Sequence, residues 1–273
     1  MRPKLGIVAG RGVLPARLVE ACRAAGRDVF VVAVKGQTEE AVVNGVCHDW
    51  VRLGAAGKVL DLLREAGVGE VVFAGPVTRP SLSSLRPDAR TAKFLAKLGK
   101  AALGDDRLLS AVIREFEGEG FRVVGADDIL EEILAPMGPF GAVVPDEVAR
   151  ADIARGTTVA RALGALDVAQ AVVVQQGIVL GIEAVEGTDA LIARCAALRR
   201  EGPGGVLVKV KKPMQERRVD LPTIGPGTVA AAADAGLRGI AVEAGSTLVI
   251  DRAAVTEAAD AAGLFVVGVS GET

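Results

Sequence analysis

The chain is poor in histidine, aromatic residues and cysteine: its 273 residues include one histidine, one tryptophan, no tyrosine and three cysteines. A lone histidine, His48, excludes a metal site with several histidines. Its neighbours Asp49 and Trp50 favour a structural role, so we expect no histidine-based triad. The cysteines show no disulfide framework and no zinc-binding spacing, which fits a reducing cytoplasm. Acid–base or metal chemistry must therefore come from Asp, Glu, Lys and Arg.

Long hydrophobic runs are also missing, although half of the residues are hydrophobic. No stretch is long enough to span a bilayer, and Met1 is followed by a strand-like run rather than by a signal peptide. The net charge is −2 and the pI is about 5.7, which argues against a nucleic-acid-binding protein. We expect a soluble cytoplasmic protein with a sizeable core, in one large or two modest domains, which could still touch a membrane surface.

Buried apolar runs alternate with helical spacing along the N-terminal half. The runs predict strands at Leu5–Ala9, Val29–Val34 and Glu70–Ala74. Helical spacing predicts helices from Leu14 to about Ala25 and from Lys58 to Ala66. This alternation is typical of a doubly wound α/β fold, so we expect a Rossmann-like domain over residues 1–135. Further elements are expected at Trp50–Leu53, Arg107–Glu119, Phe121–Gly125 and Asp127–Leu134.

A glycine loop joins the first predicted strand to the first helix. Gly10 and Gly12 flank Arg11, and Leu14-Pro15 opens the helix, so a loop of phosphate size lies at a helix N-terminus. We do not expect an NAD site, because Pro15 replaces the third glycine of the dinucleotide pattern and no acid follows the second strand. From these residues alone, a tight turn that binds nothing is the favoured explanation.

A second loop, residues 75–80, leaves the carboxyl end of a predicted strand, where ligands bind in open α/β sheets. Gly75 ends the strand, and Arg79 is a candidate anion contact whose alternative is a surface salt bridge. Further along, Asp105 and Asp106 precede an amphipathic helix. Helix capping explains these two acids without any ligand.

The segment Ala135–Gly141, followed by Pro145, is the clearest linker in the chain. We place the domain boundary there, with a second domain over residues 145–273. Strands and helices are both expected in it, which predicts a mixed α+β domain. The expected elements are a helix at Asp146–Leu163, a hairpin of Ala171–Gln175 and Ile178–Glu183, strands at Gly239–Glu243, Thr247–Ile250 and Phe265–Val269, and a helix at Arg252–Ala262.

Three acids, Glu183, Glu186 and Asp189, fall within seven residues at a predicted strand-to-helix turn. Carboxylate oxygens are ligands for a hard cation such as Mg²⁺. Capping and pairing with the helix dipole are the ordinary alternative. We favour the metal site, because acids this dense beside a glycine and Thr188 are less easily explained by capping.

The stretch Lys209–Val229 carries the most unusual composition. Its first twelve residues hold five basic side chains and two carboxylates. Alternation over Val206–Lys211 predicts a strand with Lys209 and Lys211 on one face, which Pro213 ends. Glycine and proline then introduce a predicted helix that runs to Ala235, whose N-terminus favours an anion.

Within this stretch, Arg217 and Arg218 are suited to phosphate, because guanidinium is planar and always charged. Asp220 precedes Leu221-Pro222, which favours an extended backbone and fixes the direction of its carboxylate. The alternative is a solvated basic loop in which Asp220 is a cap or a salt-bridge partner. The segment alone leaves both explanations open at near even odds.

Five stretches together resemble the LpxI-type UDP-2,3-diacylglucosamine pyrophosphatases, lipid A pathway enzymes of Gram-negative bacteria. They occur in the family's order and cover nearly the whole chain, and the stretches that contain Asp220 and Glu186 are individually specific. They are Gly6–Pro15, Phe73–Pro80, Gly104–Asp106, Glu183–Asp189 and Gln215–Gly225.

The resemblance implies hydrolysis of UDP-2,3-diacylglucosamine to UMP and 2,3-diacylglucosamine 1-phosphate, with Mg²⁺ required. It implies catalysis by Asp220 with Arg217 and Arg218, and metal binding by Asp220, Glu186 and Asp189; whether Asp220 binds metal or activates water stays open. It also implies two domains with the ligand site between them, and it suggests a homodimer and contact with the inner membrane. The implied substrate-binding residues are Gly10, Gly12, Leu14, Gly75, Arg79, Asp105, Gln170, Thr188, Lys211, Lys212 and Gln215.

Three residues depart from the family's usual pattern: Arg11, Pro76 and Ala169. They keep two other hypotheses open. One is a pyrophosphatase that acts on another UDP-sugar, and the other is a binding protein that retains the lipid or nucleotide site without turnover.

Overall fold

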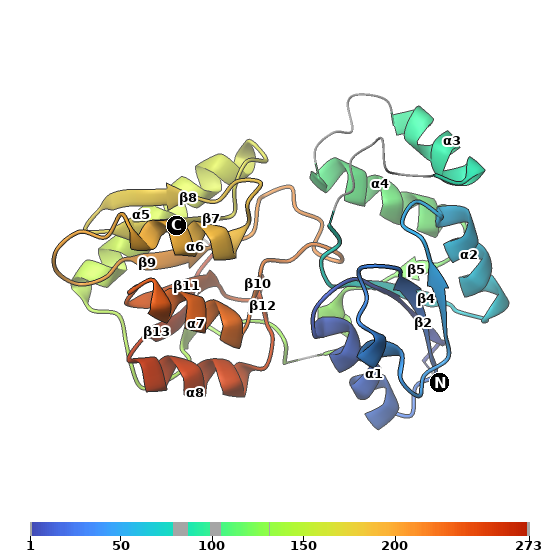
Figure 1. The fold of residues 1–273 in the computed structure, drawn as a ribbon, viewed down its shortest axis with the longest axis horizontal. Coiled ribbons are helices and arrows are strands. Elements are labelled where there is room, and N and C mark those ends of the chain that lie inside the picture. The colour runs from blue at the N-terminus through green and yellow to red at the C-terminus, as the bar shows by residue number, and fades with distance from the viewer. Residues whose placement is uncertain (1, 79–86, 99–104, 131, 272–273) are drawn as a thin grey trace. The chain divides into compact units, whose positions relative to one another are not determined.

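The structure is a computed structural model that describes residues 2–78, 87–98, 105–130 and 132–271 (Figure 1). Its internal contacts divide the chain into two compact units. The N-terminal unit comprises Met1–Glu131 together with Glu216–Asp220, and the C-terminal unit comprises Glu132–Gln215 together with Leu221–Thr273. A short segment from the second half of the chain thus belongs to the N-terminal unit.

The N-terminal unit is built on a five-stranded parallel sheet with the order β3-β2-β1-β4-β5. The central strand, β1, pairs with β2 on one side and with β4 on the other, so the order of the strands reverses beside it. Ligands of open parallel sheets bind at such a reversal, beyond the carboxyl ends of the strands. The strands are β1 (Leu5–Ala9), β2 (Val29–Val34), β3 (His48–Val51), β4 (Glu70–Ala74) and β5 (Arg122–Val123).

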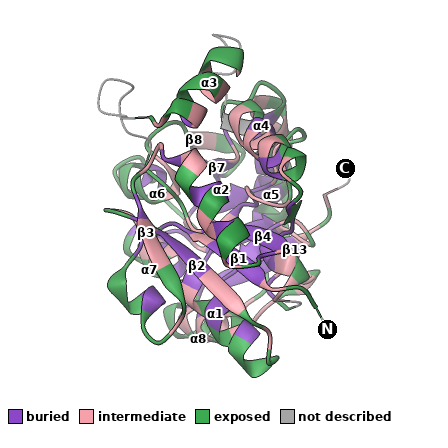
Figure 2. Ribbon diagram, turned by 90° about the vertical axis from the view of Figure 1, so that its right-hand side faces the viewer, coloured by how far each residue is buried: buried purple, intermediate pink, exposed green. Residues whose placement is uncertain are grey.

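Helices cover both faces of this sheet. On one face, α2 (Ala56–Glu65) and α4 (Asp105–Gly118) bury Leu63 and Phe116 in a cluster with sheet residues such as Val71. On the other face, α1 (Leu14–Ala24) buries Leu18, Val19 and Cys22. Figure 2 draws β1 and β4 mostly in purple, the colour of buried residues. In this unit the structure also describes α3 (Ala89–Leu98), η1 (Glu40–Val43) and η3 (Ala126–Asp128).

The C-terminal unit has a six-stranded mixed sheet with the order β6-β13-β11-β9-β7-β8. Its three central strands are parallel, while β6, β7 and β8 run antiparallel to their neighbours. A separate two-stranded sheet joins β10 to β12. The strands are β6 (Gly138–Pro139), β7 (Ala171–Gln175), β8 (Ile178–Ile182), β9 (Val206–Lys209), β10 (Thr223–Ile224), β11 (Gly239–Glu243), β12 (Leu248–Val249) and β13 (Phe265–Val269).

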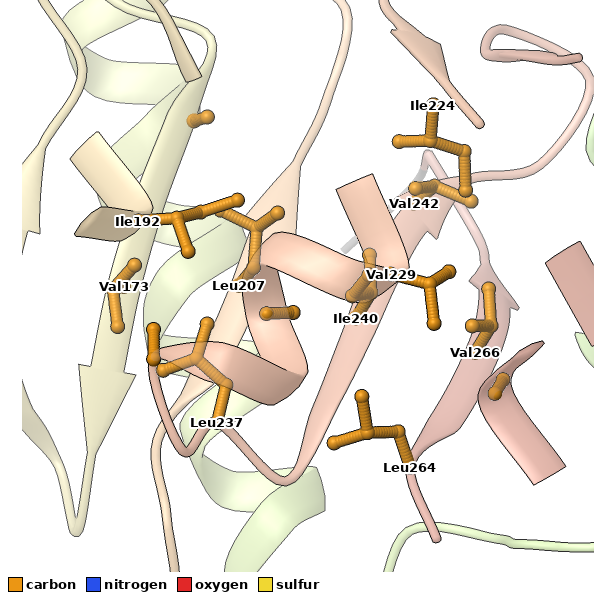
Figure 3. Close-up of a cluster of buried hydrophobic side chains, with 14 of the residues drawn as sticks. Val173, Ile192, Leu207, Ile224, Val229, Leu237, Ile240, Val242, Leu264 and Val266 are labelled. Atoms are coloured by element: carbon orange, nitrogen blue, oxygen red, sulfur yellow. The ribbon is translucent and has the colours of Figure 1, made fainter. Parts of the chain in front are cut away.

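Two apolar clusters fix the layers of the C-terminal unit. Helix α5 (Glu147–Ala165) packs on one face through Ile153, against Val172 and Val208. The other face packs against α6 (Thr188–Ala196), α7 (Pro226–Asp234) and α8 (Arg252–Ala262), in the cluster drawn in Figure 3. Helices therefore lie on both faces of a mixed sheet, in which two strand pairings are parallel and three are antiparallel.

The α/β class and most elements agree with the sequence expectations. Three details differ. Strand β9 is buried along its whole length, so the predicted alternation with one charged face is wrong. The helix expected at Asp127–Leu134 is only the short η3, and the expected linker contributes β6, which pairs with β13. Within the part of the chain that the structure describes, no helix has the length and apolarity needed to cross a membrane.

Candidate active site

The two predicted glycine loops lie side by side in the N-terminal unit. They follow β1 and β4, which are parallel neighbours, so both leave the same edge of the sheet. The amide of Gly10 donates to the carbonyl of Ala74 at 2.7 Å, and the amide of Arg11 donates to the carbonyl of Pro76 at 2.9 Å. Pro76 is one of the residues that depart from the family's usual pattern. In the structure its carbonyl accepts one of the hydrogen bonds that join the two loops.

This close approach requires glycine at two positions. A Cβ atom on Gly10 would lie 2.4 Å from the carbonyl oxygen of Gly75, and one on Gly75 would lie 2.2 Å from the carbonyl oxygen of Arg11. Gly75 also has φ +85°, which side-chain-bearing residues rarely adopt. Gly12 has φ +78° but open space around it. A side chain at Gly10 or Gly75 would separate the loops, whereas one at Gly12 would only strain the turn.

Helix α1 begins at Leu14 beside this pair of loops. Its N-cap, Val13, provides no side-chain hydrogen bond to the first turn. The first amides of a helix carry partial positive charge and favour an anion. Two other predicted substrate contacts of this unit cannot be placed: Arg79 lies outside the described residues, and Asp105 starts α4 without a described side chain.

The segment Glu216–Asp220, which carries the predicted catalytic residues, packs on the N-terminal unit. The amides of Val219 and Asp220 donate to the carbonyl of Glu216 at 3.2 and 3.0 Å, which closes a turn. Val219 packs against the cluster under α2 and α4. Asp220 is half-buried at the end of this turn.

Both arginines of the segment are paired with carboxylates. Arg217 donates from Nε and Nη2 to Oδ2 of Asp127, at 3.2 and 2.8 Å. Arg218 donates to both carboxylate oxygens of Glu216 at 3.0 Å and to Oε1 of Glu117 at 2.6 Å. The hydrogen bonds that Arg218 donates to Glu216 raise the pKa of its guanidinium, and the one that it donates to Glu117 raises this pKa further. The structure therefore shows carboxylate partners for two side chains that the sequence assigned to phosphate.

Four predicted substrate contacts come together in the C-terminal unit. Gln215 is buried; its Nε2 donates to Oε1 of Gln170 at 3.1 Å, and its Oε1 accepts from the amide of Lys212 at 3.1 Å. Lys212 donates from Nζ to Oδ1 of Asp167 at 2.6 Å. Lys211 donates from Nζ to the carbonyl of Lys212 at 3.2 Å. These residues, separated in sequence, form one polar cluster of two amides and two cations.

A second polar network, centred on Lys209, was missed as part of the site. Lys209 is only 6% exposed. Its Nζ donates to Oγ1 of Thr188 at 2.9 Å and to the carbonyl of Thr223 at 3.0 Å. Thr188 in turn donates to Oε1 of buried Glu183 at 2.6 Å. The sequence contained an indication of this network, because a lysine at the end of the apolar run Val206–Lys209 requires hydrogen-bond partners if it is buried.

The acids proposed for metal binding are distributed between the units. Asp220 belongs to the N-terminal unit, while Glu186 and Asp189 flank the start of α6. Oε1 of Glu186 accepts from Arg194 at 3.0 Å. A hydrogen bond from the residue's own amide lowers the pKa of Glu186, and Arg194 lowers it further. Both Glu186 and Asp189 are exposed.

The residues fit Mg²⁺ in chemistry but form no complete set of ligands. Carboxylate oxygens are the donors that Mg²⁺ prefers. Among the described side chains, no three His, Cys, Asp or Glu residues are grouped so that they could hold a metal ion. Mg²⁺ commonly binds through one or two carboxylates together with substrate phosphates, so binding of Mg²⁺ does not depend on a complete set of protein ligands.

Two of the three cysteines are buried. Burial raises the pKa of the thiols of Cys22 and Cys195. Thiolate is the nucleophilic form of cysteine, and the raised pKa favours the protonated form of both residues. His48 is the exposed first residue of β3, and its Nδ1 lies 2.9 Å from the carbonyl oxygen of Val46. Acid–base chemistry thus remains with the carboxylates and cations.

Comparisons with known proteins show the family of the chain. Residues 4–133 match the model of the LpxI N-terminal domain, and residues 136–267 match that of the LpxI C-terminal domain. The chain is also 48% identical, over 97% of its length and 97% of the relative's, to the "UDP-2,3-diacylglucosamine pyrophosphatase LpxI" of Caulobacter vibrioides. The chain belongs to the LpxI family.

Among solved structures, one similarity is to the biotin carboxylase subunit of pyruvate carboxylase. It covers 63% of this chain and 35% of that one, at 13% identity, with a TM-score of 0.26. A similarity this low carries no argument about fold or function. The family assignment therefore rests on the two domain matches and on the curated relative.

Proposed function

We propose that this protein hydrolyses the pyrophosphate bond of UDP-2,3-diacylglucosamine, giving UMP and 2,3-diacylglucosamine 1-phosphate in lipid A biosynthesis. The observation that carries the proposal is the 48% identity, along the whole chain, to a relative named for this pyrophosphatase activity. The site supports it with two features suited to an anionic substrate: adjoining loops at the edge of a parallel sheet, and the cluster around Lys211 and Lys212.

The proposed chemistry needs charge neutralisation and an oriented water molecule. A pyrophosphate bridge is strongly anionic, so phosphoryl transfer depends on positioning and electrostatic stabilisation. Lys211 and Lys212 supply cations. The start of α1 supplies backbone amides that no N-cap side chain occupies. Asp220 supplies the carboxylate on which turnover depends, either as a base for water or as a ligand to the metal.

We propose Mg²⁺ as the cofactor, with Asp220, Glu186 and Asp189 as its candidate protein ligands. When bound, Mg²⁺ would neutralise phosphate charge. The protein's own part is to offer hard oxygen donors; the lowered pKa of Glu186 extends the ionised form of that carboxylate to more acidic pH. Excess chelator should abolish turnover, and added Mg²⁺ should restore it. Full activity in chelator would contradict the metal requirement.

We also propose a cytoplasmic location, contact with the inner membrane and a homodimer. The acylated substrate supports membrane contact, because acyl chains partition into a bilayer. Co-sedimentation with lipid vesicles tests the membrane contact, and light scattering tests the dimer. Protein that stays in the supernatant at low and moderate salt, or that has the mass of one chain, would contradict these two proposals.

The experiment that tests the function is a comparison of substrates. UMP release should be measured from UDP-2,3-diacylglucosamine and from UDP-N-acetylglucosamine, which lacks the two acyl chains of the proposed substrate. Release from the acylated substrate alone supports the proposal. Release from the unacylated one alone would indicate a pyrophosphatase of another UDP-sugar. Tight binding of the lipid without UMP release under any divalent metal would indicate a binding protein.

A further inference from the structure

The inference concerns how Asp220 is held, and it rests on the proposed function. Asp220 is the last residue of the segment Glu216–Asp220, which belongs to the N-terminal unit. The residues that flank this segment, Gln215 and Leu221, belong to the C-terminal unit. A segment that enters and leaves a unit in five residues has few backbone contacts of its own. Its position therefore depends on side chains, and three of them make described contacts with the N-terminal unit: Arg217, Arg218 and Val219.

The pair of Arg217 and Asp127 is the best defined of these contacts. Two nitrogens of the guanidinium donate to one carboxylate oxygen, at 3.2 and 2.8 Å. The Asp127 side chain is only 12% exposed, whereas that of Arg217 is 49% exposed. Charge-assisted hydrogen bonds with more than one donor fix orientation as well as distance. The fixed partner is thus the largely buried carboxylate of Asp127, to which the more exposed Arg217 side chain extends.

Asp127 is itself held firmly. It lies in η3, directly after β5, and so follows the carboxyl end of a parallel strand of the sheet that carries the glycine loops. The neighbouring Asp128 accepts a hydrogen bond from the amide of Gly125 at 2.8 Å, which fixes the turn. The pair of Arg218 and Glu117 adds a second attachment, to the last turn of α4. That second pair is 34% and 40% exposed, so it contributes less.

We propose that Asp127 is a positioning residue for Asp220. It holds Arg217, and through Arg217 it fixes the segment Glu216–Asp220 to the N-terminal unit. In this role Arg217 does not contact the phosphates. This replaces the assignment of Arg217 from sequence and gives a function to Asp127, which lies 90 residues away in the chain and outside the signature segment.

The alternative is that Arg217 binds phosphate and that Asp127 only holds it in the absence of substrate. The two roles predict opposite effects of neutralising Asp127. If Asp127 positions the segment, Asp127→Asn should lower kcat about as much as Arg217→Gln does, because both changes break the same attachment. If Arg217 binds phosphate, Asp127→Asn should leave kcat unchanged or raise kcat/KM, since the guanidinium loses a competing carboxylate.

The kinetic test uses Asp127→Asn, Arg217→Gln and the double variant. We expect each single variant to lose roughly 10- to 100-fold in kcat, the scale on which small misplacements of a reacting group act. KM should change by less than about threefold, and the double variant should equal the singles, because coupled residues are not additive. Asp127→Glu should recover part of the loss. The matched control is Asp61→Asn, which removes an exposed carboxylate paired with Arg64 in the same unit and should change nothing.

The second measurement does not depend on turnover. Amide hydrogen exchange over residues 216–220 should speed up at least tenfold in Asp127→Asn and in Arg217→Gln, and it should be unchanged in Asp61→Asn. Unchanged exchange at this segment, or an Arg217→Gln variant with raised KM beside a fully active Asp127→Asn, would overturn the proposal. If the wild-type protein releases no UMP at all, the proposed function fails, while the exchange result still decides whether Asp127 holds the segment.

Discussion

The candidate residues of the N-terminal unit and those of the C-terminal unit are held in place in different ways. The two glycine loops of the N-terminal unit are held by backbone: the loops at Gly10 and Gly75 touch through main-chain atoms. The residues of the C-terminal unit are held by side chains, which join Lys209, Thr188 and Glu183 in one network. The contact between the glycine loops depends on the absence of side chains, whereas the Lys209 network depends on hydrogen bonds between buried side chains. Substitutions should therefore fail for different reasons in the two units.

The buried network should be the more sensitive of the two. Lys209→Met would remove both hydrogen bonds from Nζ and leave the Thr223 carbonyl and the Thr188 hydroxyl without this donor. Each buried polar group left unsatisfied costs about 1–3 kcal/mol, so we expect a loss of about 3 kcal/mol in the free energy of unfolding, measured with urea. Lys211→Met, at a half-buried position, is the control and should cost far less. Equal losses in both variants would show that burial is not what makes Lys209 important.

The contact between the glycine loops is tested by two alanine substitutions at glycines of similar φ. Gly75→Ala should cost about 1–3 kcal/mol from its left-handed backbone and should also push the loops apart, since its Cβ would meet the Arg11 carbonyl. Gly12→Ala has the same backbone strain in open space. We therefore expect Gly75→Ala to raise KM at least tenfold more than Gly12→Ala does, in steady-state assays. Similar kinetics for the two variants would show that the loop contact does not matter.

The exposed pair of Glu186 and Arg194 should have the smallest effect. Arg194→Gln removes a partner that lowers the pKa of Glu186, so that pKa should rise towards its ordinary value in an NMR titration of the carboxyl carbon. A depressed folded-state pKa stabilises the protein above the unfolded pKa, and this contribution is lost as pH falls through the folded pKa. The free energy of unfolding of the variant should thus be lower than that of the wild type near neutral pH and equal to it in strong acid. An unchanged titration would show that the ion pair does not form in solution.

The sequence predicted most strands of the five-stranded and six-stranded sheets well. It predicted poorly which side chains pair with one another. Strands β1, β2, β4, β11 and β13 have the predicted bounds, because continuous apolar runs mark buried parallel strands. The carboxylate partners of Arg217 and Arg218 could not be foreseen, since Asp127 and Glu117 lie 90 and 101 residues away in the chain. The alternation of apolar and charged residues gave a wrong prediction at Lys209, which is buried. A charged residue in a strand predicts an exposed face unless its buried partners are known.

The candidate site was predicted in its residue types more than in its arrangement. Gln170 and Gln215 were named from the family resemblance, and the structure joins them by a hydrogen bond. Position along the chain could not show that the segment Glu216–Asp220 belongs to a different unit from Gln215 and Leu221, which flank it. That division follows from packing, because Val219 has a place in the N-terminal core. Helix α3 was not anticipated at all.

The most direct test of the central claim is the turnover of Asp220→Asn beside its affinity for the substrate. UMP release from UDP-2,3-diacylglucosamine should fall about 10²- to 10⁴-fold, while calorimetry shows that the folded variant still binds the acylated substrate with an affinity near that of wild type. That pair of results would show that Asp220 acts in the chemical step. Normal turnover by a well-folded Asp220→Asn variant would contradict the account of this site.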